Sequence, residues 1–219
     1  MIRKSDIINP REKYLLPGPD QVRFAVAGQT LSLVLGSCIS TVFIGRNSGY
    51  IVSANHIMIA RERNYGVIAK KSARQQIDEI LNTYHEEFRI PDEEIRCLHV
   101  VGAGKKVNDT SFRVHDENIE ETRLVLSEKN IITLFDDTRS YYFATYSLSG
   151  GDLSVFIEDK LGNTHMSYII DLDKLFSLDL QKLSGLPASA LKPRNRGFEE
   201  FVDHGAIVFI TGEKNRANV

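Results

Sequence analysis

The chain has 219 residues, 42% of them hydrophobic and 26% charged, and its formal net charge at pH 7 is -2. This composition is typical of one globular domain of ordinary size. The near balance of charges argues against nucleic acid as a partner. No segment approaches the roughly 18 to 20 apolar residues of a membrane span, and the N-terminus lacks the apolar run of a signal peptide. We therefore expect a cytoplasmic protein with no membrane insertion.

The chain contains two cysteines, Cys38 and Cys97. Two are too few for a disulfide framework, and neither lies in a Cys/His pattern with the spacing of a zinc site. We therefore expect free thiols, with no metal and no cofactor.

The two ends of the chain differ in composition from the middle. Residues 1–20 contain Pro10, Pro17, Gly18 and Pro19 among charged residues, which predicts an N-terminal leader on the surface. Residues 21–174 are predicted to form the main domain. Residues 175–219 are predicted to be a C-terminal extension, with one apolar run at 206–210.

The middle of the chain alternates short β-rich runs with amphipathic segments. The runs predict strands at 22–27, 31–37, 40–44, 50–60 and 95–102, and later near 131–135, 141–148, 152–158 and 165–171. Apolar residues recur at helical spacing over 71–88, where Ser72 is a candidate N-cap. A second helix is predicted at 116–129, with acidic residues in its first turns.

Strands outnumber helices, and several consecutive strands are joined by segments too short for a helical crossover. This pattern predicts an α+β fold with largely antiparallel sheets and helices packed outside them.

One predicted hairpin brings a cysteine and a histidine together. Ile44 and Tyr50 flank Gly-Arg-Asn-Ser-Gly, a stretch typical of a hairpin loop. If the hairpin is centred on Asn47, Ile44 faces Tyr50 and Cys38 faces His56. Directly opposed side chains share a face, with Cβ atoms about 4.5 to 5.5 Å apart. A slip of one residue would place the two side chains on opposite faces.

A thiol beside an imidazole is the arrangement that a cysteine nucleophile needs. A free thiol has a pKa near 8.5 and is mostly protonated at neutral pH, so a neighbouring base must take its proton. His56 could do this and later return the proton to the leaving group. The alternative is structural, because a free cysteine in a strand is commonly a small buried hydrophobe and a histidine there commonly packs.

The local sequence resembles one family. Leu33-Val34-Leu35-Gly36-Ser37-Cys38, followed by Asn55-His56-Ile57-Met58, resembles the CheD family of bacterial chemotaxis deamidases. That family has Gly-Ser-Cys after one strand and His-x-Met on the next. The resemblance covers roughly residues 22–160, with further landmarks at Gly102-Ala103, Asn118 and Asp137-Thr138. The chain departs from the family pattern at Val34, Ala60 and Arg139-Ser140-Tyr141.

The resemblance implies a layered α/β/β/α sandwich and a protein-glutamine deamidase. Cys38 would be the nucleophile, His56 the general base and acid, and Ser32 would occupy the family's threonine position. The substrates would be glutamine side chains of methyl-accepting chemoreceptors, and a CheC-type phosphatase would bind and regulate the enzyme. The backbone N–H groups around Ser37 and Cys38 are the candidate oxyanion donors, with Gly36 allowing a tight backbone path.

Two other functions use the same residues. A diverged CheD-like protein could act as a non-catalytic binding or regulatory module in chemotaxis signalling. A cysteine peptidase or another amidase would need the same nucleophile and base.

Two further motifs are weaker. Val-Val-Gly-Ala-Gly-Lys-Lys at 100–106 lacks the first glycine and the final Ser or Thr of a phosphate-binding loop. Cys97 and His99 alternate on one predicted strand and should share a face, yet no further ligands lie nearby. Core packing is the preferred interpretation of that pair.

Overall fold

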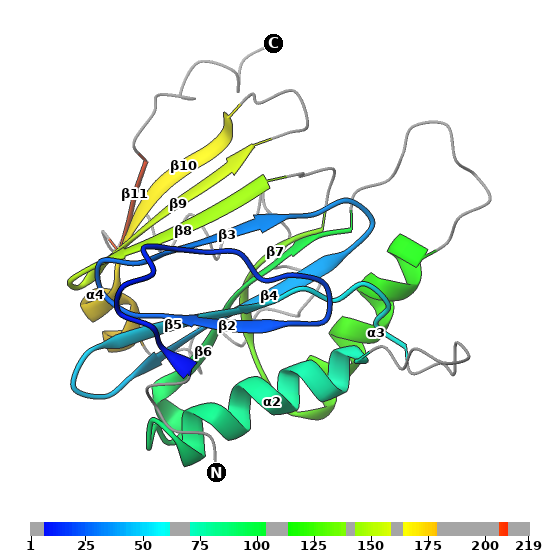
Figure 1. Cartoon of the computed structure of the whole chain (residues 1–219), viewed down its shortest axis with the longest axis horizontal. Helices are drawn as coiled ribbons and strands as arrows, with labels where there is room; N and C mark the ends of the chain where they lie inside the picture. Colours follow the sequence, from blue (N-terminus) through cyan, green and yellow to red (C-terminus); the bar gives the residue numbers. More distant parts are fainter. Residues whose placement is uncertain are drawn as a thin grey trace.

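The computed structural model describes residues 7–61, 71–103, 114–138, 143–158, 164–178 and 206–209. These residues form two stacked β-sheets, with helices α2 (Ala73–Glu86) and α3 (Val114–Glu128) packed on one outer face (Figure 1). The predicted α+β class with largely antiparallel sheets is confirmed.

The strands divide between a six-stranded and a five-stranded sheet. The six-stranded sheet has, in spatial order, β1 (Tyr14–Leu15), β3 (Thr30–Val34), β8 (Phe143–Ser149), β9 (Asp152–Glu158), β10 (Thr164–Asp171) and β11 (Ile207–Phe209). The five-stranded sheet has β2 (Val22–Ala25), β5 (Tyr50–Asn55), β4 (Ile39–Arg46), β6 (Ile95–Gly102) and β7 (Thr133–Asp137). The β1–β3 and β6–β7 pairs are parallel, and the other described pairs are antiparallel.

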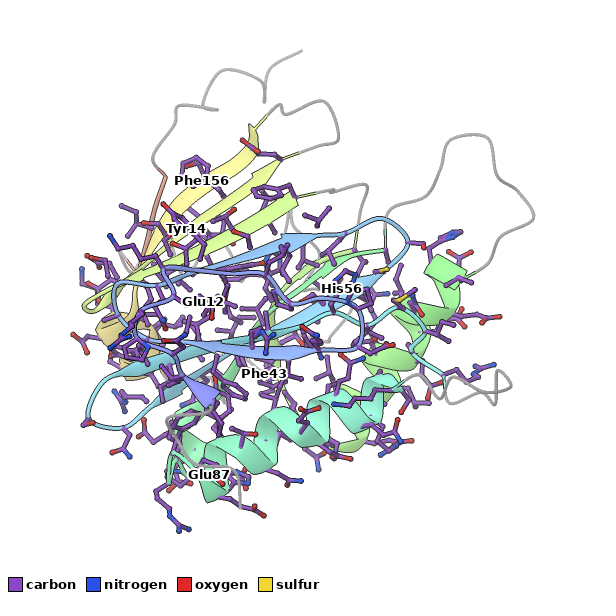
Figure 2. All side chains as sticks on the ribbon, viewed as in Figure 1. Glu12, Tyr14, Phe43, His56, Glu87 and Phe156 are labelled. Carbon is purple, nitrogen blue, oxygen red and sulfur yellow. The ribbon has the colours of Figure 1, made fainter. Side chains whose placement is uncertain are left out.

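Strand alternation produces two hydrophobic cores. Leu31 and Leu33 of β3 face Val42 and Ile44 of β4 between the sheets, and all four are 0% exposed. Successive side chains of a strand point to opposite faces, so Phe43 faces the other way, into the core beneath the helices (Figure 2). The five-stranded sheet is therefore buried on both faces.

Helix α2 begins and packs as its sequence predicts. The Ser72 hydroxyl accepts a hydrogen bond from the Gln75 N–H, and the Gln75 side chain accepts one from the Ser72 N–H. On the buried face, the Tyr84 hydroxyl donates to the carbonyls of Phe43 and Ile51, at 3.2 and 3.0 Å. A Cβ at Gly45 would lie 2.7 Å from the Tyr84 ring, so the helix can pack here only against a glycine.

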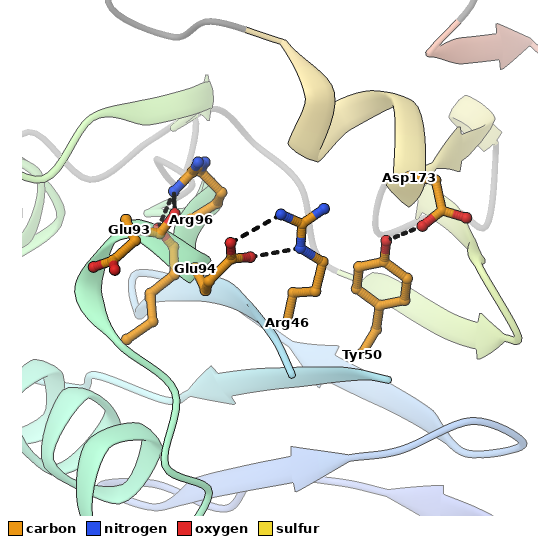
Figure 3. A network of polar contacts seen from close by, with 7 residues as sticks. Arg46, Tyr50, Glu93, Glu94, Arg96 and Asp173 are labelled. Atoms are coloured by element: carbon orange, nitrogen blue, oxygen red, sulfur yellow. Dashed lines mark hydrogen bonds and ion pairs between the residues drawn. The ribbon is translucent and has the colours of Figure 1, made fainter. Parts of the chain in front are cut away.

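The loop end of the β4–β5 hairpin is tied to the short helix α4 (Leu172–Ser177) (Figure 3). The Arg46 guanidinium lies 4.7 Å from the centre of the Phe176 ring and also pairs with Glu94 of the 3-10 helix η1 (Asp92–Glu94). The Tyr50 hydroxyl donates to Asp173 at 2.5 Å, and burial raises the pKa of Tyr50 to about 12, so the donor stays protonated. This end of the sandwich is closed by side chains.

The predicted boundaries of leader and extension need correction. Most of the described residues before Gln21 are exposed, but Leu15 is only 4% exposed and β1 pairs with β3, so this segment also belongs to the six-stranded sheet. At the other end, α4 spans the predicted boundary at residue 174, Ala206 is buried, and β11 pairs with β10. Both segments bury apolar side chains between the sheets. In the part of the chain that the structure describes, no helix has the length and hydropathy to cross a membrane.

Candidate active site

The β4–β5 hairpin has a different register from the predicted one. Ile44 pairs with Val52, and Arg46 pairs with Tyr50, so the loop is Asn47–Gly49 rather than a five-residue stretch centred on Asn47. The strand continues through Arg46 because Gly45 lies beneath Tyr84 and is part of the sheet. The actual register is displaced by two residues.

A displacement of two residues keeps every side chain on its predicted face. Ile39 and Ile57 exchange backbone hydrogen bonds of 3.0 and 2.9 Å, which extends the same register beyond the ends of the two strands. By this register Ser40 lies opposite His56, and Cys38 is the diagonal neighbour of His56, at a typical Cα separation of roughly 7 to 8 Å. The structure therefore brings Cys38 and His56 to one face at one end of the hairpin, without opposing them directly.

His56 is held by a segment that the sequence assigned to the leader. Its backbone accepts from the Asp20 N–H at 2.8 Å and donates to the Gln21 carbonyl at 3.0 Å. Its Nδ1 lies 3.1 Å from the carbonyl oxygen of Pro17. A carbonyl only accepts, so Nδ1 carries the proton and Nε2 is the basic nitrogen of the neutral ring. Figure 2 shows His56 at the end of the sandwich remote from α4.

The Cys38 thiol is free and partly buried. Burial raises its pKa above the ordinary value, and the negative charge of Asp20 raises the pKa further. The backbone N–H groups of Cys38 and Gly36 lower the thiol pKa, but by less than burial and Asp20 raise it. Cys38 is thus not a preformed thiolate and needs a base when it reacts.

The backbone around Cys38 is enclosed by the Gly102-Ala103 landmark. The Cys38 carbonyl accepts from the Ala103 N–H at 2.7 Å, and a Cβ at Gly102 would lie 2.6 Å from the same oxygen. Gly102 has φ +107° and Ala103 has φ 55°, a left-handed conformation that is uncommon for alanine. Strained backbone of this kind clusters at functional sites.

Gly36 and Ser37 differ in part from prediction. Gly36 is exposed and is not among the described residues with positive φ, and a Cβ there would meet no atom within 4 Å, so no tight path requires the glycine. The Gly36 and Cys38 N–H groups lie close enough to the sulfur to lower its pKa. The Ser37 carbonyl accepts a hydrogen bond from Asn118.

The structure does not bring Ser32 to the pair. Its neighbours Leu31 and Leu33 point into the core between the sheets, so Ser32 leaves β3 on the outer face. The exposed side chains of Tyr14 and Phe156 lie on this outer side (Figure 2). Ser32 and Cys38 are an even number of residues apart and would share a face in one continuous strand. The chain leaves β3 after Val34, so the spacing does not put them on the same face.

Ser40 is a hydroxyl that the sequence did not select. It is 0% exposed, pairs with Val101 of the core between the sheets, and so shares the face of Cys38. Its Oγ has no hydrogen-bond partner among the described residues. The sequence offered no signal for this role, because the predicted register places Ser40 opposite Ala54, and only the observed register places it opposite His56.

The second Cys/His pair is separated by a bulge. Strand β4 pairs Val42 with His99 but Phe43 with Cys97, so Leu98 is an extra residue in β6. Cys97 therefore joins the core beneath the helices, whereas Leu98 and His99 both face the core between the sheets. The expectation that Cys97 and His99 share a face is wrong.

Core packing is nevertheless the correct interpretation of this pair, since both residues are 1% exposed. Burial raises the pKa of Cys97 to about 12 and lowers the pKa of His99 to about 4. His99 Nδ1 lies 2.8 Å from the Tyr146 hydroxyl, which gives the neutral ring a partner inside the core.

Within the described residues, no group of three or more His, Cys, Asp or Glu side chains is placed to hold a metal ion. No protein-family model matches this chain, and no curated protein matches it either. What can be inferred about function therefore comes from the geometry of Cys38 and His56 and from the local resemblance of their flanking residues.

Proposed function

We propose that the protein is a cysteine-dependent protein-glutamine deamidase of the CheD type. The observation that carries this proposal is the convergence of Cys38 and His56 on one face of one hairpin, with the basic Nε2 of His56 fixed by the contact of Nδ1 with Pro17. The residues around both side chains are the ones that resemble the family.

The chemistry follows from the two groups. When a carboxamide enters, His56 Nε2 takes the thiol proton and the Cys38 sulfur bonds to the carboxamide carbon. The tetrahedral intermediate expels ammonia, to which His56 returns the proton, and leaves a thioester. His56 then removes a proton from water, whose oxygen attacks the thioester carbon. The C–S bond breaks to give glutamate and the free thiol.

Backbone N–H groups can stabilise the oxyanion of each tetrahedral intermediate. The N–H groups of Cys38 and Gly36 lower the pKa of the Cys38 thiol, and we propose them as the oxyanion donors. This modifies the sequence-based hypothesis, in which Ser37 and Cys38 were the donors.

The resemblance also supports proposals for substrate, partner and compartment. We infer that the substrates are glutamines on the cytoplasmic helices of chemoreceptors, that the enzyme works in the cytoplasm, and that a CheC-type phosphatase is its regulatory partner. Residues 139–141, where the chain departs from the family, lie outside the described residues. We propose that helices α2 and α3 form one helical layer of the family's α/β/β/α sandwich; the described residues include no second such layer.

Two observations favour a second candidate, a CheD-like binding module without turnover. The pKa of Cys38 is raised rather than lowered, and Ser32 points away from the pair. Such a module would bind receptor helices and leave their glutamines unchanged.

Mass spectrometry distinguishes the two candidates. Chemoreceptor cytoplasmic fragments are incubated with the wild type, Cys38→Ala, His56→Ala and Cys97→Ala. We expect a gain of about 1 Da for each glutamine converted to glutamate, with the wild type and Cys97→Ala only. The proposal fails if the wild type gives no gain on any fragment, or if Cys38→Ala gives the same gain. Binding without conversion would support the second candidate.

A further inference from the structure

Asn118 of α3 lies at the junction of the two segments that carry the candidate site. It is 1% exposed, and its Nδ2 donates to the carbonyls of Ser37 and Met58, both at 3.0 Å. Its Oδ1 accepts from the Ala60 N–H at 2.8 Å. The two carbonyl partners can only accept, so they must face the NH2 group of the amide, and the N–H partner can only donate, so it must face the amide oxygen. The partners therefore fix the orientation of the Asn118 amide.

These partners belong to different sides of the hairpin. Ser37 directly precedes Cys38, whereas Met58 and Ala60 follow His56. Asn118 therefore links the backbone of the thiol segment to the backbone of the imidazole segment through one rigid amide. The sequence marked this residue as a landmark and gave it no role.

The hairpin does not fix this geometry by its own ladder. Regular β4–β5 pairing ends at Val42 and Ala54, and the Thr41 N–H donates to the Asn55 side chain at 2.7 Å. Beyond that point the two segments share the single bridge between Ile39 and Ile57. Residues 20–21 and Ala103 each bind one of these segments, and α3 adds a side chain that hydrogen-bonds to both of them.

We propose that Asn118 is a positioning residue that sets the placement of Cys38 relative to His56. The amide holds the turn before Cys38 inward, against the segment after His56. Removing it leaves the Ser37 and Met58 carbonyls and the Ala60 N–H without this partner, and the half-buried turn moves toward water to hydrate them. The consequence for turnover rests on the proposed function, whereas the consequence for thiol accessibility does not.

Thiol alkylation tests the placement directly. The folded full chain is treated with iodoacetamide at pH 7.5, and peptide mass spectrometry follows Cys38 and Cys97 separately. We expect Asn118→Ala to raise the alkylation rate of Cys38 by about three- to tenfold, because the thiol loses burial, while Cys97 stays protected.

Thr122→Val is the matched control on the same helix face, one turn later. Thr122 is 0% exposed, and its hydroxyl has no hydrogen-bond partner among the described residues, so its loss should leave both alkylation rates at the wild-type level. Equal Cys38 rates in Asn118→Ala and Thr122→Val would overturn the proposal.

A second variant distinguishes a local change at Cys38 from a general loss of structure. If Asn118→Ala exposes both cysteines, Asn118→Asp is tested, because it keeps the volume but sets a carboxylate oxygen against two carbonyls. Faster alkylation of Cys38 alone supports the proposal. Exposure of both cysteines in Asn118→Asp as well would mean that Asn118 serves only the fold, and would overturn the proposal.

Deamidation kinetics test the consequence for turnover. We expect Asn118→Ala to lower kcat by about 10- to 100-fold with less than about a threefold change in KM, and to add little to the loss in a His56→Ala background. A wild type that deamidates nothing would contradict the proposed function and leave the alkylation test of Asn118 intact.

Discussion

The molecule contains two cysteine–histidine pairs with opposite outcomes. Cys38 and His56 are far apart in sequence, yet one hairpin brings them to a common face where Cys38 is only partly buried. Cys97 and His99 are separated by one residue, yet a bulge sends them to opposite faces of β6, and both are 1% exposed. Register and burial, rather than proximity in sequence, decide which pair can react with a substrate.

Burial affects the two histidines differently. His99 is neutral and satisfied by Tyr146, so it is part of the core. His56 is only partly buried, and its Nδ1 contacts the Pro17 carbonyl, which leaves Nε2 as the basic nitrogen. A histidine whose second nitrogen can still reach solvent or substrate is the one suited to catalysis.

The largest expected effect is the difference in thiol reactivity. In the folded protein at pH 8, Cys38 should react with iodoacetamide at least about 10³ times faster than Cys97, because Cys97 reacts only after the structure opens. A mass-spectrometric time course on both peptides measures this ratio. In concentrated urea the two rates should agree within a fewfold, and similar rates in the native state would contradict the comparison.

The second prediction concerns the stability of the buried pair. The folded-state pKa of His99 is about 4 and its ordinary value is 6.5, so between these values the unfolded chain binds a proton that the folded chain does not. Stability should therefore fall as pH drops from 6.5 toward 4, by about 2 to 3 kcal/mol between pH 7 and 4.5.

Urea unfolding at the two pH values measures this loss. His99→Asn keeps an acceptor near Tyr146 but has no titrating group. The stability of this variant should therefore not show the loss on acidification that we attribute to His99. If wild type and His99→Asn lose equal stability on acidification, His99 does not titrate as we expect.

The third prediction changes the charge beside Cys38. Asp20→Asn removes the negative charge that raises the thiol pKa, so Cys38 should alkylate about two to five times faster at pH 7.5. Asparagine tolerates the φ of 60° at this position. Asp152→Asn, at the start of β9, is the control and should leave the rate unchanged. Slower alkylation of Cys38 in Asp20→Asn would contradict the conclusion that the Asp20 charge raises the thiol pKa.

The smallest expected effect separates geometry from resemblance. Ser32 lies on the outer face of β3, so Ser32→Ala should change the deamidation rate by less than about twofold. A loss of tenfold or more would instead place Ser32 in the site, as the resemblance implies. In the same assay, a loss of activity in Ser40→Ala would show that the buried hydroxyl opposite His56 takes the role that the resemblance assigns to Ser32.

Local sequence determined several elements and one feature of the site. Helix α2 and its Ser72 cap follow from local periodicity and capping chemistry, and β6 spans 95–102 as its apolar run predicts. The shared face of Cys38 and His56 was predictable even with the wrong loop, because the face depends only on whether the register shifts by an odd or an even number.

Tertiary structure decided everything that depends on a distant contact. Tyr84 of α2 packs on Gly45 and so places it in the strand, which sets the loop at 47–49. The partners of His56 come from residues 17–21, and those of the turn before Cys38 come from α3 and Gly102-Ala103. Periodicity records which face of an element is apolar but does not record what packs against it. For that reason the shared face of Cys38 and His56 was predictable from the sequence, whereas their exact register, the groups that orient them and the causes of the Cys38 pKa shift were not.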